Sequence, residues 1–221
     1  MPSYSGIWTL QQQMQAKAQS LWPVPPFSYI GQPIGGGYYA GQISTAGNGV
    51  ADYYLVVGPV ASAQSTLQWK TSNTTTAGTN SVINGPTNSS NMNNASHPAG
   101  QFCENLTVGG FSDWYMPAKN ELEVCYYNLK PTTNVNNTSS GINPNSVPAR
   151  ASNYSAGTPA QTSATDFQST GAEDFSPSYY WTSTENTAID AWGQYFNSGN
   201  QVNYFGKSFA YRVRAVRRVA V

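Results

Sequence analysis

Few residues in this chain have side chains suited to catalysis. It has one histidine, His97, two cysteines, Cys103 and Cys125, and ten acidic residues, of which only Glu173 and Asp174 are adjacent. The motifs G-x-S-x-G, G-x-x-x-x-G-K-[ST] and H-E-x-x-H, which mark nucleophile elbows, phosphate loops and zinc sites, are absent. A glycosidase would need two carboxylates facing each other across a cleft, and nothing in the sequence selects such a pair. We therefore expect a protein that is not an enzyme.

The cysteines and the histidine admit several structural roles. Cys103 and Cys125 do not form a C-x-x-C redox motif, and a zinc site would need His97 and a carboxylate as further ligands. Because no secretory signal is visible, buried thiols are favoured, with a Cys103–Cys125 disulfide as the alternative. We expect His97 at the surface or at a helix cap. No metal or cofactor is expected; calcium, held by Asn-rich loops, is the open alternative.

Aromatic and amide side chains form the best candidate for binding. Tyr and Trp offer rigid stacking faces and Asn adapts its hydrogen bonds, a combination also used by antibody paratopes. Trp192 and Phe196 share one strand face and are assigned to the core. Tyr195 faces oppositely, and residues 197–204 are expected in or near a turn. The candidate receptor or ligand contacts are Trp181, Tyr195, Asn197, Asn200, Asn203 and Tyr204.

Positive charge gathers near the end of the chain, at Arg212, Arg214, Arg217 and Arg218. One interpretation is a solvated strand face whose arginines pair with nearby acids, and this is favoured. The other is a patch for an anionic ligand such as a sulfated or phosphorylated glycan. Asp113 and Glu121 are assigned structural roles, close to turn amides and to the positive end of a helix dipole.

Composition excludes several classes of protein. Only 9% of residues are charged and the net charge is zero, so a basic nucleic-acid-binding surface is not expected. Aromatic residues make up 13% of the chain, which argues against disorder. The longest apolar stretch is far shorter than the ~20 residues of a membrane-spanning helix, so no membrane insertion is expected.

The elements that must position these residues follow from periodicity and turn residues. A short amphipathic helix over 9–21, with a T-x-x-Q capping box, precedes a proline-rich hinge, and it either packs on its own domain or docks to another subunit. Its candidate docking residues are Trp8, Leu10, Met14, Leu21 and Trp22. Further helices are predicted over 99–106 and 118–129, long polar loops over 71–97 and 132–178, and strands over 37–43, 52–57, 179–184, 191–196 and 210–219. This pattern predicts an α+β fold, divided into a segment 1–29 for attachment or oligomerisation and a domain 30–221.

Several motifs resemble one known family. Residues 109–122 (GGFSDWYMPAKNEL), 180–185 (YWTSTE), 191–192 (AW) and 211–217 (YRVRAVR) are similar to signatures of the Legionella collagen-like protein C-terminal domain family. The similarity covers about residues 30–221, and the sequence differs at Thr182, where serine is usual. The resemblance implies a C-type-lectin-like domain with long loops, and brings neither catalytic residues nor a calcium motif.

The resemblance also implies a biological setting, because members occur in bacterial adhesins and in bacteriophage tail or fibre proteins. Residues 5–10 are similar to short virion-attachment segments. We therefore expect a bacteriophage virion protein, at a tail fibre or tail tip, that binds a host-surface receptor, in particular a glycan. Its expected partners are other virion proteins and further copies of itself in a homotrimer, and it would be assembled in the host cytoplasm. The alternatives are a structural connector or capsid-decoration protein, a bacterial surface adhesin, or an enzyme related to the lectin-like formylglycine-generating fold.

Overall fold

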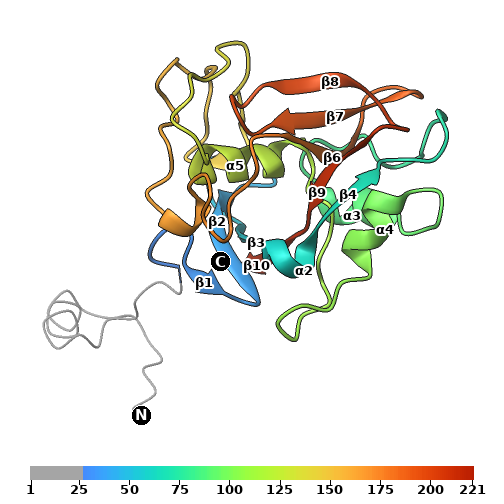
Figure 1. Cartoon of the computed structure of the whole chain (residues 1–221), viewed down its shortest axis with the longest axis horizontal. Coiled ribbons are helices and arrows are strands. Elements are labelled where there is room, and N and C mark those ends of the chain that lie inside the picture. The colour runs from blue at the N-terminus through green and yellow to red at the C-terminus, as the bar shows by residue number, and fades with distance from the viewer. Residues whose placement is uncertain (1–26) are drawn as a thin grey trace, which may run out of the picture.

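The chain folds into two β-sheets with a helix between them, in a computed structural model that describes residues 27–221 (Figure 1). The first sheet has the order β1 (Pro33–Ile34), β2 (Gly37–Ile43), β3 (Tyr53–Val57), β10 (Val216–Ala220), and β5 (Ser146–Val147) also pairs with β2. The second has the order β4 (Gln64–Gln68), β9 (Ala210–Arg214), β6 (Tyr179–Glu185), β7 (Asp190–Tyr195), β8 (Gln201–Gly206). The predicted α+β class is confirmed.

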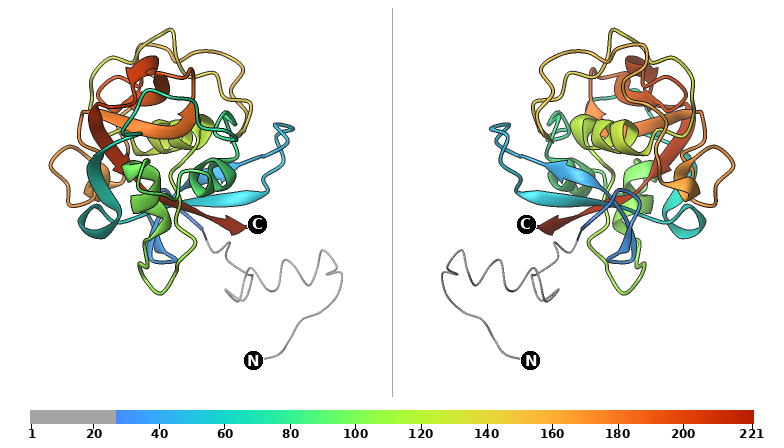
Figure 2. Two further views of the ribbon diagram at one scale, coloured as in Figure 1. Left: turned by 90° about the vertical axis from the view of Figure 1, so that its right-hand side faces the viewer. Right: turned by 90° about the vertical axis from the view of Figure 1, so that its left-hand side faces the viewer.

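The helices fill the spaces beside and between the sheets. They are α2 (Val60–Ala63), α3 (Gly85–Ser90), α4 (Pro98–Glu104), α5 (Lys119–Leu129) and a 3-10 turn, η1 (Thr165–Phe167). Helix α5 contacts β2 of one sheet and β6 and β7 of the other, and two further views show it between them (Figure 2). Helix α4 packs on β4, and α3 packs on α4 and β6. No helix among residues 27–221 is long and apolar enough to span a membrane.

The largest difference from the predicted elements lies at the end of the chain. The strand predicted over 210–219 is two strands, β9 and β10, which belong to different sheets. They part at Ala215, whose N–H donates to the carbonyl of Ala63 instead of to a strand partner. The polar stretch 71–97 contains α3, which begins at a Gly-Pro pair and is capped by Asn84. Residues 201–206 form strand β8, although residues 197–204 were expected in or near a turn.

Two apolar clusters make up the core, and each holds one cysteine. Cys103 lies with Trp114 and Trp181 in one cluster, and Cys125 lies with Tyr126 in the other. Both thiols are free and fully buried, and burial raises their pKa values. The favoured interpretation as buried thiols is confirmed, and the disulfide alternative is wrong because the two residues belong to separate clusters.

The domain already packs at the first described residue. The ring of Phe27 is buried and stacks on Tyr54 with a centroid distance of 3.9 Å, so packing starts ahead of residue 30. The predicted helix 9–21 and the docking residues Trp8, Leu10, Met14, Leu21 and Trp22 lie outside the described residues.

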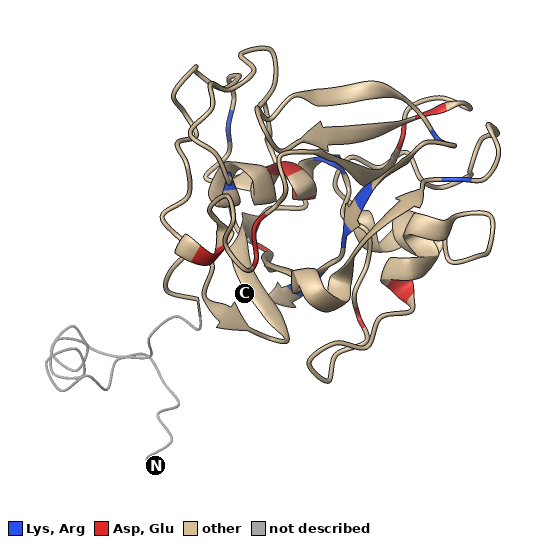
Figure 3. Cartoon of the chain, in the orientation of Figure 1, with Lys and Arg blue, Asp and Glu red and all other residues tan. Residues whose placement is uncertain are grey.

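Many of the few charged residues within 27–221, whose positions on the ribbon are marked in Figure 3, form ion pairs. Each of five basic side chains pairs with a different carboxylate, and four of these carboxylates are at most 12% exposed. The pairs are Arg150–Glu123, Lys207–Glu185, Arg214–Glu173, Arg217–Asp113 and Arg218–Glu121. A protein with so little charge has therefore placed half of it in ion pairs between segments that are distant in sequence.

His97 lies in one of these internal clusters, which corrects its predicted position at the surface. It is 4% exposed, and its Nε2 and Nδ1 lie 2.8 Å from Thr76 Oγ1 and from Asn94 Oδ1. Burial, together with the charges of Lys70 and Lys207, lowers the pKa of His97 to about 4. The residue is at the N-terminus of α4, yet its side chain makes no capping bond. One ring nitrogen contacts Asn94 in the loop before the helix, and the other contacts Thr76 in the loop after β4.

This cluster gives a prediction for stability against pH. An unfolded histidine titrates near pH 6.5, so between about pH 6.5 and 4 the unfolded chain binds a proton that the folded chain does not. The free energy of unfolding should therefore fall as the pH is lowered through this window, by about 3 kcal/mol in all. Urea denaturation of the wild type and of His97→Gln at several pH values measures it. Subtracting the two profiles removes the titration of the carboxylates, and parallel profiles would contradict the prediction.

Candidate functional site

The outer face of the second sheet carries the largest group of accessible aromatic rings. In β6, Tyr179 and Trp181 point to this face, and in β9 Tyr211 does so, because side chains alternate along a strand. Phe205 of β8 is 9% exposed, and a Cβ on Gly193 would lie 2.8 Å from its ring. Glycine at 193 therefore leaves the room in which the Phe205 ring lies, at the centre of the face.

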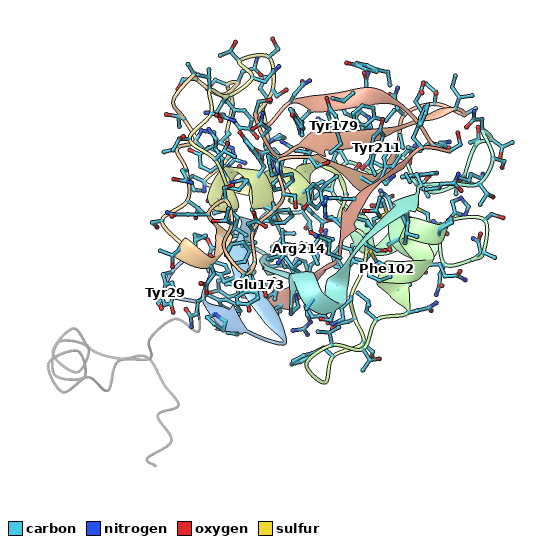
Figure 4. All side chains as sticks on the ribbon, viewed as in Figure 1. Tyr29, Phe102, Glu173, Tyr179, Tyr211 and Arg214 are labelled. Carbon is cyan, nitrogen blue, oxygen red and sulfur yellow. The ribbon has the colours of Figure 1, made fainter. Side chains whose placement is uncertain are left out.

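Five rings around Phe205 form what we call the aromatic platform: Tyr179, Tyr195, Tyr204, Phe209 and Tyr211. Tyr204 and Phe209 are 70% and 61% exposed, and the other three are partly exposed. Tyr179 stacks on Tyr195 at 4.4 Å between centroids and lies 5.6 Å from Tyr211. The labelled side chains of Tyr179 and Tyr211 lie close together in the upper part of Figure 4.

The hydroxyl groups distinguish the platform from the buried tyrosines. The hydroxyls of Tyr115, Tyr126, Tyr154 and Tyr180 each donate to a side chain inside the protein. None of the four platform tyrosine hydroxyls hydrogen-bonds to another residue in the described part of the chain. Burial and the neighbouring tyrosines raise the pKa of Tyr179, so its hydroxyl stays protonated at neutral pH. The platform thus offers apolar ring faces together with uncommitted donors and acceptors, and it carries no charge.

The predicted contact residues divide between the platform and its support. Tyr195 and Tyr204 belong to the platform. Trp181 is fully buried beneath it and donates its indole N–H to the carbonyl of Leu67, so its assignment as a contact is wrong. Asn203 is exposed, while Asn197 bonds through its side chain to Asn134.

The other assignments near this sheet also change. Asn200 lies in the predicted turn, and its carbonyl accepts from Tyr195 N–H. Of the two residues assigned to the core, Phe196 is fully buried, but Trp192 is partly exposed and lines a cavity.

The four arginines near the end of the chain do not form a free anionic-ligand patch. Arg214, Arg217 and Arg218 are each paired with a carboxylate, and only Arg212 has no ion pair among the described residues. The expectation of pairing with acids is confirmed, although the strands are largely buried and not solvated. Asp113, expected near turn amides, instead holds Arg217 at 2.7 and 2.9 Å.

Three platform residues, Tyr179, Phe209 and Tyr211, were not among the predicted contacts. Tyr179 and Tyr211 lie in segments assigned to strands, where an aromatic residue is expected in the core, and Phe209 directly precedes the strand predicted over 210–219. The signal available was the alternation of aromatic residues, Tyr179 with Trp181 on one strand and Phe209 with Tyr211 at the start of another. Only the parallel pairing of β6 with β9 shows that these residues share one face.

The comparisons with known proteins agree with the resemblance noted in the sequence. No curated protein and no solved structure matched the chain. The profile of the Lcl C-terminal domain family matches residues 58–217, which includes all of the second sheet, helices α2 to α5 and the platform. This family suggests a surface protein with a role in adhesion. The chain belongs to the Lcl C-terminal domain family.

Proposed function

We propose that the protein is an adhesion module that binds a host-surface receptor, in particular a glycan, through the aromatic platform. The observation that carries the proposal is a set of accessible rings whose hydroxyls have no partner in residues 27–221. Sugar rings present C–H faces that stack on aromatic side chains, and hydroxyls that need hydrogen-bond partners. The ring faces of the platform suit the first, and its uncommitted tyrosine hydroxyls suit the second.

The fold and the setting are also part of this proposal. We infer a C-type-lectin-like domain, supported by the pairing of early strand β3 with last strand β10 and by the long loop region between α5 and β6. The protein would act in a bacteriophage virion, at a tail fibre or tail tip, as a homotrimer. Several weak sites on one particle would then raise the overall affinity through effective concentration.

Substitutions on the platform test this function. Tyr204→Ala and Tyr179→Ala should each weaken binding about tenfold, because each removes a stacking face worth about 1 kcal/mol and a hydroxyl contact. The chain is screened on an array of bacterial surface saccharides, and dissociation constants are then measured by calorimetry for the saccharide bound best.

Tyr29→Ala is the matched control, because Tyr29 is 61% exposed and lies on the other side of the molecule from the platform (Figure 4). It should bind like the wild type. If the wild type binds no saccharide, the glycan receptor is wrong. If the platform variants bind as well as Tyr29→Ala, the platform is not the site, and a buried contact with a neighbouring virion subunit becomes the better assignment.

A further inference from the structure

Two adjoining cavities lie among the loops beside α5, away from the platform. One, of about 420 Å³, is lined by Trp192, Lys119 and the loop 139–144. The other, of about 430 Å³, is lined by Tyr127 and residues 149–155. Asn153 lines both, so the two cavities adjoin at this residue, and we call them together the groove. Asn153 is exposed, and its side chain makes no hydrogen bond within the described residues, which leaves its amide free for a ligand.

The Trp192 end of the groove carries an unpaired positive charge. Lys119 Nζ lies 4.6 Å from the centroid of the Trp192 ring, and no carboxylate of the described residues is within ion-pair distance. The surrounding wall is largely apolar, with Ile142 50% exposed and Val82 40% exposed. An ammonium group held against an indole in such a wall attracts an anion more strongly than one in open water.

A polar group at the same end has no partner. Gln201 lines this cavity, and its Nε2 is buried without a hydrogen-bond acceptor in the described part of the chain. A buried donor in this state costs about 1–3 kcal/mol, so a ligand or water that supplies an acceptor stabilises the site.

At the opposite end of the groove a cation also lies against an aromatic ring, but there a carboxylate neutralises its charge. The guanidinium of Arg150 stacks on Tyr127, with its central carbon 4.0 Å from the ring centroid. Glu123, whose side chain is fully buried, pairs with Arg150 and accepts from the hydroxyl of Tyr154 at 2.6 Å. The groove therefore has one charged end and one neutral aromatic end, joined by a free amide.

We propose that this groove binds a short acidic saccharide, with a carboxylate at Lys119 and a neighbouring ring extending past Asn153 towards Tyr127. The carboxylate would complete the ion pair that Lys119 lacks, and the sugar hydroxyls would bond to Asn153. The groove shares no residue with the platform, so it is a second site, and the loss of either one leaves the other intact.

The probe is trigalacturonic acid, with its methyl ester as the uncharged match, and binding is measured by calorimetry on the full chain. We expect the acid to bind, the ester to bind at least tenfold more weakly, and Lys119→Gln to lower the affinity for the acid about tenfold. Asn153→Ala should weaken binding of acid and ester alike. Because Asn153 is exposed, this variant tests the groove even if Lys119→Gln disturbs the start of α5.

Arg212→Gln is the control, since it removes a cation that has no ion pair and lies outside the groove; its affinity should equal that of the wild type. The platform variant Tyr179→Ala should also bind the acid normally, which separates failure of this site from failure of the platform. Three results would each overturn the proposal. They are equal affinities for acid and ester, no binding of the acid at millimolar concentration, and a loss of affinity in Arg212→Gln as large as that in Lys119→Gln.

Discussion

Replacing Arg214 by methionine should lower the free energy of unfolding by about 3–5 kcal/mol, the cost of breaking a buried ion pair from one side. Arg214 is 1% exposed, and it joins three separate segments of the chain. Its Nε donates to the carbonyl of Gly58 at 2.8 Å, and its Nη1 and Nη2 donate to the carbonyl and to the carboxylate of Glu173 at 2.9 and 2.7 Å. The labelled pair lies at the centre of the molecule (Figure 4).

The effect is large because the carboxylate of Glu173, whose side chain is only 12% exposed, would be left without its cation. Its carboxylate also accepts from the N–H of Val60 at 2.8 Å, so it cannot turn towards solvent without losing that bond. The guanidinium lies 4.7 Å from the ring centroid of Phe175, and methionine replaces this packing only in part. Urea denaturation at pH 7 measures the change.

Arg212→Met is the matched control on the same strand. Arg212 is partly exposed and has no ion pair among residues 27–221, so its replacement should change the free energy of unfolding by less than about 0.5 kcal/mol. Equal losses for the two variants would show that Arg214 does not act through the pair with Glu173.

Replacing Glu121 by alanine should destabilise the protein by a similar amount, about 3–5 kcal/mol. Glu121 is fully buried near the start of α5, where its Oε2 accepts from the N–H of Ala118 at 2.8 Å. Its Oε1 accepts from the hydroxyl of Tyr115 at 2.6 Å and from Nε of Arg218 at 2.8 Å. Alanine would remove the helix cap and leave the Arg218 cation without its carboxylate.

Glu104→Ala provides the comparison for this variant. Glu104 is partly exposed, lies at the end of α4 and has no ion pair in the described residues, so we expect a loss of about 1 kcal/mol or less. Thermal unfolding followed by circular dichroism ranks the two variants. A loss for Glu121→Ala no greater than that for Glu104→Ala would contradict the role of Glu121 as the acceptor shared by three segments.

These two predictions bear on the unusual composition of the chain. A sequence with 9% charged residues could have placed them on its surface for solubility. The structure instead places five ion pairs between loops, strands and α5, and leaves the platform with aromatic rings and neutral polar groups. The low surface charge then suits contact with neutral sugar faces, because a ligand need not displace strongly hydrated ions.

Helices and strands are well predicted where their sequence signal lies within the element itself. The strand over 37–43 matches β2, and the helix after Pro117 matches α5. The prediction failed at Ala215, because a run of alternating residues continues through it and nothing in the alternation marks a change of sheet. It failed for β8 as well, since Asn- and Gly-rich neighbours are typical of turns, while β8 forms by pairing with β7.

The candidate site likewise has features that the sequence predicts and features that depend on tertiary packing. The sequence by itself determined the family, the α+β class, and the supply of tyrosine, tryptophan and asparagine from which a binding surface is made. It also identified Tyr195, which faces away from Trp192 and Phe196 on its strand, and Tyr204, which was expected in or near a turn. Which rings are accessible was decided only by the tertiary structure.

The physical reason is that burial depends on what packs against a face, and not on the residue or its neighbours in sequence. Trp181 and Tyr179 lie on the same face of one strand, yet Trp181 is covered and Tyr179 is not fully covered. Likewise, Arg212 and Arg214 share a strand face, and only Arg214 meets a carboxylate, carried by a loop that precedes β6. Alternation fixes the direction of each side chain, and long-range packing fixes its partner.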